Sequence, residues 1–132
     1  MITPLLALSL LASPQAAPAA AAAEPGLEYF DAKKLADADE ASVTGPAHDA
    51  MLADQRKLLD AAVEACAQFN KVSDFTAFTV VMRLDADGRV QKTWREGMSP
   101  LALCVQGQVR GKIAFMPPKA PFYSALEVSF TK

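Results

Sequence analysis

The spacing of apolar side chains changes its period near the middle of the chain, and this change constrains the fold most. Between residues 47 and 70, apolar side chains recur at steps of three and four, as they do along one face of an α-helix. Between residues 75 and 84 they alternate with other side chains, and this run is rich in Phe, Thr and Val, which favours a β-strand. A further alternating run, from Tyr123 to Thr131, predicts another strand near the C-terminus.

A tight turn is predicted at Asp85-Ala86-Asp87-Gly88, because glycine supplies the positive φ that such a turn needs. Residues 89–95 then form a second strand of a hairpin, with Val90, Lys92 and Trp94 expected on one face. The same four residues resemble the start of a calcium loop. The further oxygen ligands and the closing Glu are not correctly placed, however, so a plain turn is expected.

A second helix is predicted after Ser99-Pro100, which suit the cap and the first helical position. The order of elements predicts an α+β fold: a small antiparallel three-stranded sheet (ββαβ) with an additional N-terminal amphipathic helix packed on one face. The other face is expected to be partly polar, through Thr79, Arg83, Gln91, Thr93, Glu127 and Ser129.

The N-terminal segment predicts export. Residues 1–23 carry no charged side chain, and their leucine-rich run is followed by alanines, as in a signal peptide cleaved after Ala23 or, as a second candidate, after Ala19. Because no Lys or Arg precedes the run, an uncleaved anchor and an Ala-rich tail remain alternatives. Residues 24–46 are expected to form a linker or partly ordered arm, with a short helix near residues 31–38, and residues 47–132 the folded domain.

The two cysteines, Cys66 and Cys104, each lie on the apolar stripe of a predicted helix. An even number of cysteines in an exported chain favours a disulfide, which is predicted here, although two buried thiols remain an alternative. Their separation does not resemble a C-x-x-C redox pair, and with one histidine in the chain, His48, the ligands for structural zinc are too few.

Charge and motifs exclude several function classes. The net charge is −2, which disfavours nucleic-acid binding. No nucleophile elbow, phosphate loop or metal motif is present, so we expect no catalytic residues, no cofactor and no enzymatic activity. Residues 24–70 carry ten acidic and four basic side chains, whereas residues 71–132 carry nine basic and five acidic ones. We expect the two halves to attract each other; a basic surface facing an anionic envelope is the alternative.

The second half of the chain resembles a known family. Asp85-Ala86-Asp87-Gly88-Arg89-Val90, then Ser99-Pro100-Leu101, Phe115-x-Pro117-Pro118 and the closing Leu126–Phe130 run resemble the C-terminal domain of TonB-type energy transducers. A cysteine in this helix, here Cys104, resembles the branch of that family that is related to gliding-motility proteins. The resemblance covers about residues 75–131.

The resemblance implies binding of an envelope protein or peptide by strand pairing at an exposed sheet edge. The edge would involve Tyr123, Ala125, Leu126, Glu127, Val128, Ser129 and Phe130. Energy transducers also have a membrane helix and a long Pro-rich span, whereas this chain offers residues 24–46, so a periplasmic or secreted adaptor without a stable membrane span is expected. The alternative is a binder of small apolar ligands or of envelope surfaces, with candidate residues Trp94, Met98, Met116, Phe122 and Tyr123.

Overall fold

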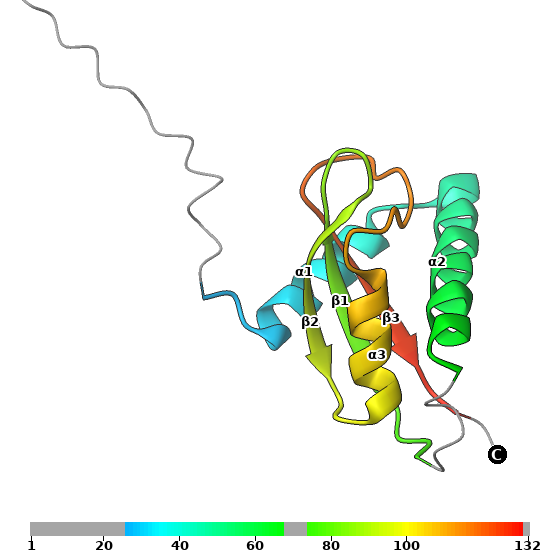
Figure 1. Ribbon diagram of the computed structural model, residues 1–132. Coiled ribbons are helices and arrows are strands. Elements are labelled where there is room, and N and C mark those ends of the chain that lie inside the picture. Colours follow the sequence, from blue (N-terminus) through cyan, green and yellow to red (C-terminus); the bar gives the residue numbers. More distant parts are fainter. Residues whose placement is uncertain (1–25, 68–73, 131–132) are drawn as a thin grey trace, which may run out of the picture.

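A computed structural model describes residues 26–67 and 74–130, so the predicted signal peptide and its cleavage site lie outside the described residues. In these ranges the helices are α1 (Tyr29–Ala41), α2 (Gly45–Ala65) and α3 (Pro100–Val109). The strands are β1 (Phe78–Leu84), β2 (Val90–Glu96) and β3 (Phe122–Val128), which form one antiparallel sheet in the order β2-β1-β3 (Figure 1). The predicted α+β fold is confirmed.

The β1–β2 hairpin forms at the predicted turn, where Gly88 has a φ of 83°. One carboxylate oxygen of Asp85 accepts hydrogen bonds from the backbone N–H groups of Asp87 and Arg89, both at 2.9 Å. The register then shifts, because Arg83 pairs with Lys92 but Leu84 pairs with Val90. This bulge places Val90 in the core on one face of the sheet and Trp94 in the cluster on the other, so the expectation that Val90 and Trp94 share a face is wrong.

Helices α2 and α3 cover one face of the sheet and enclose the larger core. Its fully buried side chains include Val80, Met82, Leu84, Val105 and Phe122. The predicted disulfide is present: the sulfur atoms of Cys66 and Cys104 lie 2.08 Å apart, with their Cα atoms at 6.0 Å. The bond joins the end of α2 to the middle of α3, as expected for cysteines on two facing apolar stripes.

Helix α1 covers the opposite face of the sheet, and this corrects two expectations. From Tyr29 onward the predicted arm is a helix packed on the sheet (Figure 1), and the face expected to be partly polar holds a second small core. Ala32 and Ala36, one turn apart, are fully buried against Val81, Trp94 and Tyr123. Small side chains let the helix backbone approach the sheet closely, which explains why a chain segment with few large apolar groups still packs there.

Candidate functional site

Strand β3 lies at an edge of the sheet, because β1 is its only partner strand in the part of the chain that the structure describes. The predicted edge residues fall on and just after this strand: Tyr123 and Leu126 are buried on opposite faces, whereas Phe130 is part-exposed beyond the strand's end. The Phe130 ring contacts Phe75 edge to face, with ring centroids 5.7 Å apart. The residues predicted from the sequence therefore lie along one edge, but the surroundings of this edge differ from one end to the other.

The end of α1 caps the first half of this edge. The backbone N–H of Tyr123 donates to the Asp39 carboxylate at 2.9 Å, and the N–H of Ala125 donates to the Glu40 carboxylate at 2.7 Å. Asp39 is buried, and its other oxygen pairs with Lys119 at 2.8 Å. Two backbone donors that a partner strand would need are thus already engaged by side chains of the same chain.

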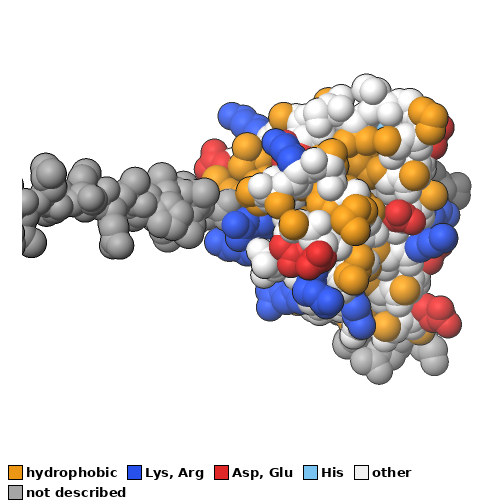
Figure 2. All heavy atoms as spheres, turned by 90° about the horizontal axis from the view of Figure 1, so that it is seen from above, with side chains coloured by type: hydrophobic (Ala, Val, Ile, Leu, Met, Phe, Trp, Pro, Cys, Tyr) orange, Lys and Arg blue, Asp and Glu red, His pale blue; other side chains and the backbone are white. Residues whose placement is uncertain are grey.

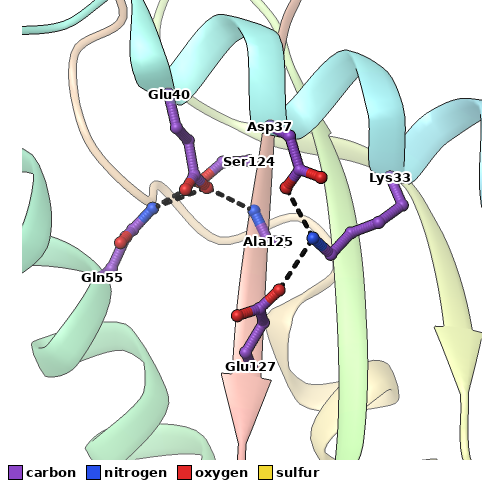
Figure 3. Close-up of polar contacts among 7 residues, drawn as sticks. All are labelled: Lys33, Asp37, Glu40, Gln55, Ser124, Ala125 and Glu127. Atoms are coloured by element: carbon purple, nitrogen blue, oxygen red, sulfur yellow. Dashed lines mark hydrogen bonds and ion pairs between the residues drawn. The ribbon is translucent and has the colours of Figure 1, made fainter.

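Glu40 also joins three elements in one polar cluster (Figure 3). One oxygen of its carboxylate accepts hydrogen bonds from Gln55 on α2 at 3.2 Å and from the Ser124 hydroxyl on β3 at 2.9 Å. The Gln55 amide donates in turn to the Ser124 hydroxyl at 2.6 Å. Gln55 and Ser124 are both buried, so the cluster satisfies polar groups that would otherwise be costly between the layers.

A salt bridge fastens the middle of α1 to the same flank. The Lys33 ammonium contacts Asp37 at 2.5 Å and Glu127 at 2.8 Å (Figure 3). Hydrogen bonds to Asp37 and then to Glu127 raise the pKa of Lys33, so this ammonium stays charged throughout the neutral range. Both carboxylates are largely exposed, so the bridge positions α1 more than it stabilises the fold.

The second half of the β3 edge is open. Because the N–H groups of Tyr123 and Ala125 point away from β1, strand alternation directs the N–H and C=O of Glu127 outward as well. In the described part of the chain, no group accepts a hydrogen bond from the Glu127 N–H. A groove of about 530 Å³ follows this half of the edge, between β3 and α2; its lining residues are Arg56, Leu59, Asp60, Val63, Glu64, Glu127, Val128 and Ser129.

The capping carboxylates were missed at the level of sequence, although one signal was present. Asp39 and Glu40 occupy the last turn of α1, where the helix dipole disfavours negative charge, and no basic residue accompanies them in that turn. In this structure, hydrogen-bond donors on β3 offset that unfavourable position. The sequence pattern gave no way to name backbone donors more than eighty residues away.

A second hollow lies at the end of the molecule where α2 begins. This groove of about 430 Å³ is mainly apolar and is lined by Val43, Ala47, Ala50, Met51, Asp54 and the residues from Phe115 to Pro118. Hydrophobic side chains are exposed at this end of the molecule (Figure 2). Of the five predicted apolar-ligand residues, Trp94, Phe122 and Tyr123 are buried in the two cores, while Met98 and Met116 are exposed and only Met116 lines the groove.

The described ranges show no group of three or more His, Cys, Asp or Glu side chains placed to hold a metal ion. None of the helices in these ranges combines the length and the apolar character needed to cross a bilayer. Fold and site together define a disulfide-linked α+β domain with a half-capped sheet edge. Comparisons with protein-family models, with curated proteins and with solved structures found no match to this chain.

Proposed function

We propose that this chain is an exported, periplasmic protein-binding or adaptor module that resembles the C-terminal domain of TonB-type energy transducers. It binds an extended segment of an envelope protein by adding a strand to the open half of the β3 edge. The observation that carries the proposal is the division of that edge. Its N–H groups at Tyr123 and Ala125 are capped, whereas no group among the described residues caps the edge at Glu127, which borders a groove.

The disulfide supports the proposed compartment. Disulfides persist in oxidising environments such as the bacterial periplasm and are rare in the cytosol. The Cys66–Cys104 bond is therefore consistent with the export predicted from residues 1–23.

The divided edge supports the proposed binding mode. Natural proteins protect edge strands, because an open row of backbone donors and acceptors pairs readily with another chain. Here the protection stops after Ala125, although the strand continues to Val128. In strand addition the backbone hydrogen bonds supply affinity, and a groove beside the edge accepts alternate side chains of the partner.

Substituting Glu127 by proline tests this mode. Proline removes the outward N–H but no hydrogen bond to β1, and edge strands tolerate it where the N–H faces outward. Glu127→Ala is the matched control, because it loses the same carboxylate and keeps the N–H. The binding assay uses an array of synthetic peptides covering envelope proteins. We expect some of them to bind the wild type, to keep most of their affinity for E127A and to lose binding to E127P.

A second measurement guards against misfolding of E127P. Peptides N-methylated at alternate residues lose their own backbone donors and should no longer bind the unaltered protein. Strand addition would be contradicted if no peptide on the array binds. It would also be contradicted if the peptides bind E127P as well as the wild type, or if their N-methylated forms bind the wild type as well as the unmethylated ones.

Apolar-ligand binding is the second candidate, and the groove lined by Met51, Phe115 and Met116 favours it. Met116 is exposed at the rim, so Met116→Lys should abolish binding of a hydrophobic dye there without unfolding the protein. Dye binding that is insensitive to M116K would exclude this groove as the ligand site.

A further inference from the structure

The open half of the β3 edge carries a pattern of charge and apolar surface that selects its partner. We infer that it binds an extended segment in which basic side chains alternate with apolar ones. The inference rests on the proposed strand addition and names the chemical class of the segment that is added.

The face toward α2 selects the apolar side chains. Val128 points to this face, where it packs against the core, and Leu59 and Val63 of α2 line the groove beside it. Residues directly opposite each other in a strand pair place their side chains on the same face. A partner residue opposite Val128 therefore enters the groove beside Leu59 and Val63, and an apolar side chain buries the most surface there.

The face toward α1 selects a basic side chain. Glu127 alternates to this face, where its carboxylate and that of Asp37 share one cation, the Lys33 ammonium. Both carboxylates are more than 60% exposed, with 64% for Glu127 and 63% for Asp37. A partner residue opposite Glu127 meets a surplus of negative charge, so Lys or Arg is favoured and Glu or Asp is disfavoured.

The rim of the groove has the same sign. Asp60 pairs with Arg56 at 3.3 Å, and Glu64, one turn further along α2, has no basic partner within ion-pair distance among residues 26–67 and 74–130. Among residues 26–67 and 74–130, the ion pairs of these four carboxylates, on Asp37, Asp60, Glu64 and Glu127, are with Lys33 and Arg56 only. Each exposed charge pair changes the affinity for the partner segment by only about 1.4- to 5-fold. The cluster as a whole therefore acts mainly on the choice of partner and on the rate of association.

The test compares two labelled seven-residue peptides by fluorescence anisotropy on the oxidised protein. Both carry valine at alternate positions; one has lysine and the other glutamate at the positions between. We expect the lysine peptide to bind at least about fivefold more tightly at low ionic strength, with a smaller difference in 0.5 M salt because charges screen over about a Debye length.

Two charge reversals on α2 locate the effect. Glu64→Lys lies at the groove rim and should reduce the preference for the lysine peptide. Asp49→Lys makes the same charge change on the same helix, at an exposed position outside the groove lining, and should leave the preference unchanged. An equal effect of both substitutions would assign the preference to net charge and contradict the inference.

The outcomes separate the inference from the proposed function. Equal affinity for both peptides, with binding lost in E127P, contradicts the inference and leaves strand addition intact. Tighter binding of the glutamate peptide, or displacement of the lysine peptide by a second copy of this chain, also contradicts it. Binding of neither peptide up to millimolar concentration contradicts both proposals.

Discussion

At the scale of single residues, two carboxylates at an electrostatically unfavourable position define the edge. Asp39 and Glu40 lie in the last turn of α1, where the helix dipole favours cations. They are stabilised there because backbone N–H groups of β3 donate to both, and because Gln55 and Ser124 donate to Glu40. The capping bonds compensate for the unfavourable helix position.

We predict that Glu40→Ala lowers the free energy of unfolding by about 1–3 kcal/mol, because it removes the acceptor of buried hydrogen-bond donors. Asp37→Ala is the control on the same helix; its carboxylate is exposed and makes only a surface salt bridge, so a loss below about 1 kcal/mol is expected. Urea denaturation measures both. Equal losses for the two variants would show that the Glu40 cluster is not a structural cap.

At the scale of elements, the sequence predicted the parts whose pattern is strong. The helices around Cys66 and Cys104 and the three strands all have clear apolar periodicity, and each appears near its predicted position. Helix α1 as a packed element was not predicted, because the residues that it buries are Ala32, Ala36 and the polar Asp39. Alanine carries little hydrophobic signal, and a buried carboxylate has none. The bulge that separates Val90 from Trp94 was missed for a related reason, since alternation assumes an unbroken register.

Helix α1 should be dislodged by one larger side chain on its buried face. Ala36 is fully buried, so Ala36→Leu overpacks the contact with the sheet and should cost about 1–3 kcal/mol. The single tryptophan, Trp94, lies in this contact and donates to the Leu27 carbonyl at 2.8 Å, so its emission should shift to longer wavelength. Ala38→Leu, at an exposed position of the same helix, should leave both the stability and the emission nearly unchanged. A silent A36L variant would contradict the packing described for α1.

The disulfide should account for much of the attachment of α2 to α3. It closes a loop between positions separated by 38 residues, which corresponds to about 3–4 kcal/mol of stability in the chain-entropy estimate. We expect the Cys66→Ala/Cys104→Ala double variant and the reduced wild type to unfold at the same, lower urea concentration. Reducing agent should not affect the double variant. A difference of less than about 1 kcal/mol between oxidised and reduced wild type would contradict this role.

At the scale of the whole molecule, the sheet lies between two helical layers, and the uncapped half of β3 is a stretch of edge backbone that a partner can contact. The predicted attraction between the acidic N-terminal half and the basic C-terminal half is only partly observed. Asp39 of the acidic half pairs with Lys119 of the basic half, as predicted. In another ion pair between the halves, the base is in the acidic half and the acid in the basic half, because Lys33 pairs with Glu127. The sequence predicted which strand carries the candidate edge, but not that this edge is divided into a capped half and an open half. That division depends on contacts between α1 and β3, which are separated by the whole domain in sequence.

Amide hydrogen exchange along β3, followed by NMR, tests the divided edge most directly. In the free protein we predict slow exchange for the N–H groups of Tyr123 and Ala125 and fast exchange for that of Glu127. Saturation with the lysine peptide should slow the exchange of Glu127 and leave the first two unchanged. A Glu127 amide that is protected without a partner, or that still exchanges fast when the peptide is bound, would contradict binding by strand addition at this edge.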